Sequence, residues 1–269
     1  MTVDSYLALA LDLVDLADEI TMRLFRATDL VVSTKPDNTP VTEADHAVEQ
    51  AIREHLAIYA KEHAILGEEF GYDETDDSEY RWIIDPIDGT KSYLRGVPIW
   101  ATLVGLEWGG EMVVGVVSAP ALHTRWWAGR GLGAFRDGDP IHVSAVEAIE
   151  DAHISFSWDT TERFEHGRFD TNVMALARRC WRSRSLGDFW QHVLVAEGAL
   201  DAAAEPVISP WDVAALQPII EEAGGRFSDL SGAARIDGGS IVCTNGRLHE
   251  AVLSALAPGA GARPQAAPD

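Results

Sequence analysis

The sequence of 269 residues contains 21 Lys and Arg against 43 Asp and Glu, which gives a formal net charge of −22. This excess of negative charge repels nucleic-acid phosphates and anionic membrane surfaces, so the sequence predicts neither as a partner. A content of 46% hydrophobic and 24% charged residues excludes a disordered acidic chain and indicates one large domain, or two small ones, around a packed core.

The first apolar stretch has the pattern of an amphipathic helix over residues 3–27. No basic segment precedes it, so it is not predicted to be a secretion signal, and no run reaches the roughly 18 apolar residues of a membrane span. Two cysteines, Cys180 and Cys243, are too few for a disulfide framework, although one bridge stays open. We therefore expect a reduced, cytoplasmic protein.

A second helix is predicted from residue 42 to about residue 59, where Thr42 and Asp45 have the spacing of a capping pair. Residues 82–84 form a short apolar run, which predicts a buried strand that stops at Asp85-Pro86. Further strands are expected at residues 98–108, 111–119, 123–128 and 133–136, separated by glycine and proline. This succession is typical of an antiparallel meander.

After about residue 150 the predicted elements alternate. Strands are expected at residues 154–157, 181–185, 200–204 and 240–244, and helices at residues 169–179, 188–197, 211–223 and 248–256. Pro218 lies inside the third of these helices and should bend or open it. We therefore expect an α+β half (1–150) joined to an α/β half (151–257), followed by a tail without regular structure (258–269).

Acidic residues next to glycine, proline or threonine at the ends of elements are the most informative part of the sequence. Asp85 ends a predicted strand, Asp88 follows at a turn, and the Gly89 and Thr90 amides are placed to hold an anion. Carboxylates and amides so close together suit divalent cations with a phosphate across them. An Asx turn, in which the acids only accept backbone N–H groups, is the alternative for this segment alone.

Three further acidic segments weaken that alternative. Glu68 and Glu69 follow another predicted strand, and Asp212 and Asp45 each lie at a predicted helix start. Taken singly, the helix-start acids are explained by capping and the glutamates by a solvated loop. Their combination in one chain is not explained by capping.

Four blocks, in this order, resemble the signature of the inositol monophosphatase family, a group of magnesium-dependent, lithium-sensitive phosphatases that act on sugars and other small molecules. The blocks are Lys35 with residues 39–45 (TPVTEAD), residues 67–69 (GEE), residues 85–90 (DPIDGT) and residues 211–215 (WDVAA). The resemblance spans roughly residues 5–256. It implies a layered αβαβα fold, a homodimer, a small-molecule phosphate ester as substrate, and two or three Mg²⁺ ions per active site.

The resemblance also implies roles for single residues. The first ion would be bound by Glu68, Asp85 and the Ile87 carbonyl, the second by Asp85, Asp88 and Asp212, and a third, weakly held, by Glu68. Asp45 and Thr90, with Glu68, would act on the attacking water, and the Gly89 and Thr90 amides would receive the phosphate. Lys35 would lie near the phosphate.

Residues 186–190 occupy the place where the family's sugar phosphatases have glycine followed by small residues. Here Asp188 follows Gly187, and Glu205 matches a family position that contacts the alcohol part of the substrate. Two carboxylates favour a cationic alcohol over a neutral polyol, and Trp100 and Trp190 would add a ring face for it. These features resemble the bacterial histidinol-phosphate phosphatases of the family. The implied substrate residues are Gly89, Thr90, Arg184, Asp188, Glu205 and Asp212.

Several alternatives stay open. Asp188 is also explained as a helix N-cap, and the tryptophans as core residues. An inositol monophosphatase lacks support from Asp188, and a 3′-phosphoadenosine 5′-phosphate phosphatase would suffer repulsion between its second phosphate and the two acids. A phosphate- or metal-sensing protein would show a broken signature, which this sequence does not. Ser92 replaces the asparagine that often follows the DGTK segment, and no histidine pair has zinc spacing.

Overall fold

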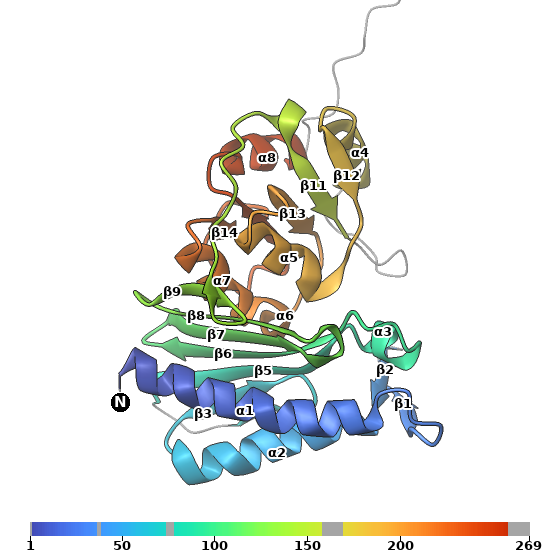
Figure 1. Cartoon of the computed structure of the whole chain (residues 1–269), viewed down its shortest axis with the longest axis vertical. Coiled ribbons are helices and arrows are strands. Elements are labelled where there is room, and N and C mark those ends of the chain that lie inside the picture. The colour runs from blue at the N-terminus through green and yellow to red at the C-terminus, as the bar shows by residue number, and fades with distance from the viewer. Residues whose placement is uncertain (1, 37–38, 74–77, 158–168, 258–269) are drawn as a thin grey trace, which may run out of the picture.

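The computed structural model describes residues 2–36, 39–73, 78–157 and 169–257, so the predicted tail 258–269 lies outside the described residues. Its elements form five layers, helix–sheet–helix–sheet–helix, along the long axis of the molecule (Figure 1). The expected layered αβαβα fold is therefore confirmed. The short 3-10 helices are η1 (Pro120–Leu122) and η2 (Ile149–Asp151).

The outer layer at the N-terminal end consists of α1 (Val3–Leu24) and α2 (Glu43–Tyr59), drawn in blue in Figure 1. Each begins with a capping box, because Thr2 and Ser5, and likewise Thr42 and Asp45, bond each other's backbone N–H groups. Both helices bury an apolar stripe against the first sheet. The two predicted helices and the capping pair are confirmed.

The first sheet has eight strands in the order β10-β9-β8-β7-β6-β5-β3-β4. They are β3 (Ala64–Gly67), β4 (Gly71–Asp73), β5 (Tyr80–Asp88), β6 (Ala101–Trp108), β7 (Glu111–Ala119), β8 (Thr124–Gly129), β9 (Gly133–Arg136) and β10 (Asp139–Pro140). From β5 to β10 each strand is antiparallel to the next, which confirms the meander, whereas β3 runs parallel to β5. The pair β1 (Val32–Thr34) and β2 (Pro40–Thr42) forms a separate small sheet that the sequence did not indicate.

Strand β5 does not stop at Asp85-Pro86 as predicted. Its pairing with β6 shifts register between Asp85 and Asp88 and then resumes. Pro86 has no N–H for the ladder, but its carbonyl accepts a hydrogen bond from Thr102 Oγ1 at 2.8 Å, which keeps the strand attached to β6 across the irregularity. The chain then enters the short helix α3 (Thr90–Leu94).

Helices α5 (Asp188–Ala196), α6 (Pro210–Ala214) and α7 (Leu216–Glu222) lie between the two sheets (Figure 1). The predicted helix over 211–223 is divided at Ala215, as expected from Pro218, which cannot donate to the carbonyl at the end of α6. This helix pair lies very close to β7: a Cβ built on Gly115 would meet the Ala215 carbonyl oxygen at 2.0 Å. Only glycine permits this approach.

The second sheet has five strands in the order β12-β11-β13-β15-β14 and is covered by the outer helices α4 (Phe169–Ala177) and α8 (His249–Leu256). The strands are β11 (His153–Phe156), β12 (Arg182–Arg184), β13 (Ala202–Glu205), β14 (Arg226–Ser228) and β15 (Ile241–Thr244). Strand β11 is parallel to β12 and β13, whereas β15 is antiparallel to β13 and β14. Strand β14 was not predicted.

Both cysteines, Cys180 and Cys243, are free thiols, so the bridge left open by the sequence is absent. Among the described residues, none of the helices combines the length and the apolar character that a membrane span requires.

Candidate active site

Three carboxylates meet where β5 ends and α6 begins. Asp85 and Asp88 come from β5, and Asp212 comes from the first turn of α6. Each offers an oxygen within 4.8 Å of the other two, which is close enough for a shared metal ion. Asp85 is only 2% exposed. The irregular end of β5 thus brings two acids three residues apart to the same point as an acid from the C-terminal half.

This cluster carries negative charge that nearby basic groups do not neutralise. Burial, followed by the charges of Glu68, Asp88 and Asp212, raises the pKa of Asp85 well above its usual value. Burial is likewise the main reason that the pKa of Asp212 rises to about 7, against the lowering effect of the Ser209 N–H. Carboxylates in this state favour a proton or a divalent cation in their midst.

Glu68 lies beside the cluster, directly after β3, and is held by Lys35. The Lys35 ammonium lies 2.7 Å from Glu68 Oε1 and 2.8 Å from Glu69 Oε1. Burial raises the pKa of Glu69 to about 7 although Lys35 opposes the rise. Gly67 keeps this turn tight, because a Cβ there would meet the Glu49 carboxylate, which accepts the Glu69 N–H at 2.7 Å.

Asp45 both caps α2 and reaches into the site. Its Oδ2 accepts bonds from the Thr42 N–H at 2.8 Å and the Thr42 hydroxyl at 2.6 Å. Its Oδ1 lies 3.5 Å from Thr90 Oγ1, which also donates to the Ile87 carbonyl at 3.0 Å. Burial raises the pKa of Asp45 despite the bonds from Thr42. The sequence offers helix capping and a role in the active site as alternatives for Asp45. Its two oxygens allow both, because Oδ2 bonds Thr42 and Oδ1 faces Thr90.

Gly89 forms the start of α3 in the left-handed conformation, with φ of 82°. A Cβ at this position would lie 3.0 Å from the Ile99 carbonyl and 3.2 Å from Asp188 Oδ2. No side chain of the described residues caps α3. The first backbone N–H groups of α3 therefore have no capping side chain among the described residues, and the space around Gly89, beside the carboxylates, is tight.

A cavity of about 450 Å³ opens over this arrangement. Its lining residues are Lys35, Thr39, Pro40, Glu68, Gly89, Thr90, Lys91, Asp188, Ser209, Trp211 and Asp212. Asp85 and Asp88 lie beneath it, and Asp88 Oδ2 accepts the Phe189 N–H of α5 at 2.6 Å. The cavity therefore has acids beneath it and two lysines, Lys35 and Lys91, in its lining. It suits a phosphate only when cations are bound beneath it.

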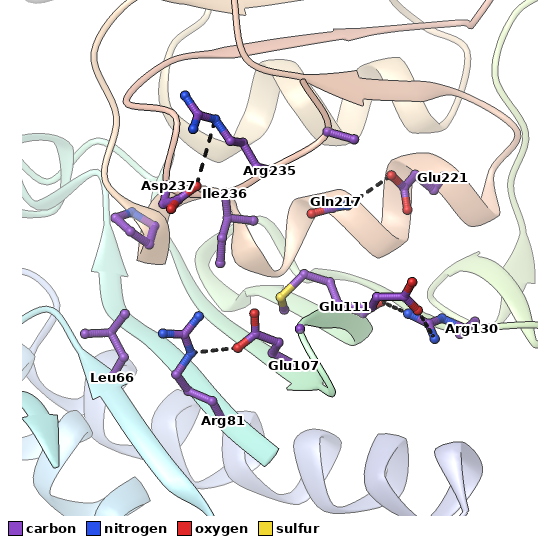
Figure 2. Close-up of a pocket in the computed structure, with 14 residues that line it drawn as sticks. Leu66, Arg81, Glu107, Glu111, Arg130, Gln217, Glu221, Arg235, Ile236 and Asp237 are labelled. Atoms are coloured by element: carbon purple, nitrogen blue, oxygen red, sulfur yellow. Dashed lines mark hydrogen bonds and ion pairs between the residues drawn. The ribbon is translucent and has the colours of Figure 1, made fainter. Parts of the chain in front are cut away.

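A second cavity, of about 650 Å³, lies between the first sheet, α7 and the segment before β15 (Figure 2). Here the charged groups pair with one another: Arg81 with Glu107 at 2.8 Å and Arg130 with Glu111 at 2.7 Å. It therefore lacks the concentration of unbalanced acids that marks the first cavity.

Asp188 and Glu205 provide a further pair of acids beside the cluster. Burial and the charge of Glu205 raise the pKa of Asp188 to about 6, while Lys91 and His192 oppose the rise. Asp188 adopts a left-handed backbone with φ of 49°, a conformation that aspartate tolerates better than most residues. Glu205 ends β13 and lies 3.3 Å from His192 Nε2.

Comparison with known proteins gives the chain's relatives. The profile of the inositol monophosphatase family matches residues 2–258. Histidinol-phosphatases of Mycobacterium tuberculosis and Streptomyces coelicolor are 48% and 47% identical to this chain over 94% and 93% of its length, and over 98% and 96% of their own. The crystal structure of the extragenic suppressor protein suhB from Bartonella henselae superposes with a TM-score of 0.88 at 28% identity, covering 95% of this chain and 99% of that one.

The chain belongs to the inositol monophosphatase family. It is therefore a phosphatase of a family that depends on metal ions. The family membership, the fold and the enzyme class expected from the four blocks are confirmed. The structure of this family member brings Asp45, Glu68, Asp85, Ile87, Asp88, Gly89, Thr90, Asp188, Glu205 and Asp212 to one region.

In the specificity region one expectation, the ring face of Trp100, is wrong, and one alternative, Asp188 as a helix N-cap, is excluded. Trp100 is fully buried and packs edge-on against Tyr93, so it offers no face to a substrate. Asp188 is not the N-cap of α5: Gly187 holds that position, and Asp88 accepts the first-turn N–H. Trp190 is half-buried against the central core.

Arg184 is placed outside the cavity lining. It lies on the edge strand β12, is exposed, and donates to the adjacent Ser183 carbonyl at 2.8 Å. His192 was not indicated by the sequence, because one histidine among nine scattered ones shows no spacing pattern. Its position on α5, facing the end of β13, emerges only from the packing of that helix on the second sheet.

Proposed function

We propose that this phosphatase hydrolyses L-histidinol phosphate to L-histidinol and phosphate, a step of histidine biosynthesis. The observation that carries the proposal is the acid pair Asp188 and Glu205 at the cavity of about 450 Å³ above the acid cluster. Such a pair favours an alcohol that carries an ammonium group and a titratable imidazole. The names of the two relatives at 47–48% identity support the same substrate.

Magnesium is the metal that the donor set fits. Buried carboxylates with raised pKa values and a backbone carbonyl are hard oxygen ligands, and no cysteine or histidine of the described residues joins the cluster. Two or three ions would be held, one by Glu68, Asp85 and the Ile87 carbonyl, another by Asp85, Asp88 and Asp212, and a weak third by Glu68. When bound, Mg²⁺ neutralises the phosphate, lowers the pKa of water and stabilises the leaving oxygen.

The protein's own groups orient the reactants. Asp45 Oδ1 and Thr90 Oγ1, which lie 3.5 Å apart, are placed to align the attacking water and to take its proton, with Glu68 assisting. The Gly89 and Thr90 amides and Lys35 receive the phosphate oxygens. Water oxygen bonds to phosphorus as the ester P–O bond breaks, and the alcohol oxygen leaves toward Asp212, Asp188 and Glu205. The proton taken from the attacking water balances the one that the leaving oxygen takes up to become the alcohol, while the second water proton stays on the phosphate.

Phosphate release in the presence of Mg²⁺ tests the substrate. We expect kcat/KM for histidinol phosphate to exceed that for inositol 1-phosphate and for 3′-phosphoadenosine 5′-phosphate by at least about tenfold, which corresponds to about 1.4 kcal/mol. A preference for inositol 1-phosphate would replace this proposal by the family's name-giving activity. Absence of turnover on every ester would instead favour a sensor.

Asp188→Asn separates the two parts of the proposal. Asparagine also tolerates the left-handed backbone, so the fold should remain intact. We expect kcat/KM for histidinol phosphate to fall about 10–100-fold, which corresponds to the free energy of a hydrogen bond to a charged group. The kcat/KM for phenyl phosphate should fall much less. An equal loss on both esters contradicts the role of Asp188 in selecting the alcohol.

We further propose a cytoplasmic homodimer in which the α+β half (1–150) supplies most metal ligands and the α/β half (151–257) supplies the substrate acids. Because Arg184 is exposed on edge strand β12 and donates to the Ser183 carbonyl, it would contact the substrate only if dimer formation moved its side chain. Light scattering of the purified chain should give twice the mass of 29.3 kDa. A monomer that is fully active contradicts the dimer.

A further inference from the structure

His192 is a buried side chain that the proposed chemistry leaves unused. It lies one turn after Asp188 on α5, which packs against β13 and β15, and is 1% exposed. Its Nδ1 lies 3.0 Å from the sulfur of Cys243, and its Nε2 lies 3.3 Å from Glu205 Oε2. The imidazole thus joins a buried strand to one of the two acids beside the cavity.

The arrangement makes Nε2 a donor toward Glu205 in either charge state of the ring. In the neutral ring, the Cys243 thiol donates to Nδ1, which leaves the proton on Nε2; in the charged ring both nitrogens carry protons. The side-chain amide nitrogen of Gln191 also lies near Nε2 of His192, but at the longer distance of 3.4 Å. The side-chain carbonyl oxygen of Gln191 accepts a hydrogen bond from the Ser155 hydroxyl at 2.7 Å. The carboxylate is the stronger partner for an N–H group.

Glu205 needs such a partner because its other neighbours repel it. Its charge acts on Asp88, Asp188 and Asp212, all in the same site. Its side chain is 15% exposed, so water screens this repulsion only in part. Without a donor on the protein side, the carboxylate would favour a rotamer that points away from the other acids.

We propose that His192 is a positioning residue that holds the Glu205 carboxylate in place for the cationic part of the substrate. This inference rests on the proposed function, because it assigns Glu205 to the alcohol end of a cationic phosphate ester. His192 itself contacts neither the substrate nor the reacting atoms. It acts through Glu205, and its effect is therefore confined to substrates that use Glu205.

The test compares two esters in two variants. In His192→Phe, which keeps a ring but has no donor, KM for histidinol phosphate should rise about tenfold with kcat within about twofold, while both constants for phenyl phosphate stay unchanged. In His192→Gln, whose amide can donate to Glu205, most of the loss should be recovered. Equal effects on both esters, or no recovery in His192→Gln, overturn the inference.

A double-mutant cycle with Glu205→Gln isolates the coupling. If His192 acts through Glu205, adding His192→Phe to Glu205→Gln has no further effect on KM for histidinol phosphate. Additive effects show that His192 supports the site by packing alone. His249→Phe is the matched control: this histidine is equally buried but bonds Ser228 and Thr244, and its replacement should alter stability without changing the ratio between the esters.

Wild-type protein supplies a measurement that does not depend on folding of the variants. Nitrogen NMR of the imidazoles should show Nε2 of His192 protonated, and an unprotonated Nε2 overturns the inference. The wild-type kinetics also separate the two proposals. If the wild type does not prefer histidinol phosphate over inositol 1-phosphate, the proposed function fails and this inference with it; if it does and the variants leave KM unchanged, only this inference fails.

Discussion

Asp85 lies buried among three other carboxylates, so a single atom change there should separate catalysis from stability. Asp85→Asn removes a ligand of the proposed metal site, and kcat/KM should fall at least about 100-fold, because a bound metal contributes several kcal/mol to the transition state. The same change relieves repulsion by Glu68, Asp88 and Asp212, so the metal-free variant should unfold at a higher temperature than the wild type.

Asp201→Asn is the matched control for that variant. Asp201 is also buried, at 5% exposure, but its carboxylate accepts the His153 N–H at 2.6 Å and the Ser144 hydroxyl. Losing a charged acceptor there should lower the melting temperature and leave kcat/KM unchanged. Near-normal turnover in Asp85→Asn, or a lower melting temperature without metal, contradicts the account of the cluster.

His249 should make the protein less stable in weak acid. Burial, with help from Arg226, lowers the pKa of His249 to about 4, whereas an unfolded histidine has a pKa of about 6.5. Between these values the unfolded chain binds a proton that the folded chain does not, so this contribution to stability is complete above about pH 6.5 and declines toward pH 4. Urea unfolding at pH 7 and pH 5 measures it, and His249→Gln should show a smaller difference between the two than the wild type.

At this scale the sequence predicts the acids better than their partners. Asp85, Asp88 and Asp212 belong to short blocks that are recognisable by their spacing along the chain, although β5 continues through Asp85 to Asp88 and does not end where the sequence predicts. Trp100 was wrongly expected to face the substrate because burial depends on packing: Tyr93 and Phe25 enclose it. His192 was missed for the same reason, since its partners lie on strands 13 and 51 residues further along the chain.

At the scale of elements, the contact of α6 and α7 with β7 sets the position of Asp212. Gly115→Ala would push the helix pair from the sheet, because the new Cβ would lie 2.0 Å from the Ala215 carbonyl oxygen and 2.7 Å from Pro218 Cγ. We expect a loss of about 1–3 kcal/mol in unfolding free energy and a several-fold higher Mg²⁺ concentration for half-maximal activity.

Val117→Ala on the same strand is the control for this effect. Val117 is fully buried, and its truncation leaves a small cavity that moves no helix. Stability should fall by about 2 kcal/mol with the Mg²⁺ requirement unchanged. If Gly115→Ala and Val117→Ala alter the Mg²⁺ requirement equally, the helix position does not control the site.

The sequence predicted the helices and the long strands because their periodicity and caps are local. It failed where an element depends on its neighbours. Strand β5 continues past Pro86 because Thr102 on β6 supplies a hydrogen bond, and the short β14 exists because β15 pairs with it. Neither partner can be inferred from the segment itself.

At the scale of the whole molecule, the formal net charge is −22. Part of the negative charge lies in one buried site, the cluster of Asp85, Asp88 and Asp212. In the metal-free protein burial raises the pKa values of Asp85 and Asp88, and that of Asp212 to about 7. An unfolded aspartate has a pKa near 3.9. The folded state therefore binds more protons above pH 4, and the stability that this protonation provides is lost as pH rises through about 7.

Magnesium should reverse this pH dependence, because it binds the deprotonated carboxylates of the folded state alone. We expect the rise in melting temperature on adding Mg²⁺, relative to EDTA, to be larger at pH 8 than at pH 5.5, where protons compete for Asp212. Taking the difference between the two conditions at each pH cancels titrations elsewhere, including that of His249. Ca²⁺ should also stabilise, since it accepts the same oxygen ligands. A rise that is equal at both pH values, or that persists in Asp85→Asn, means that Mg²⁺ binds outside the cluster.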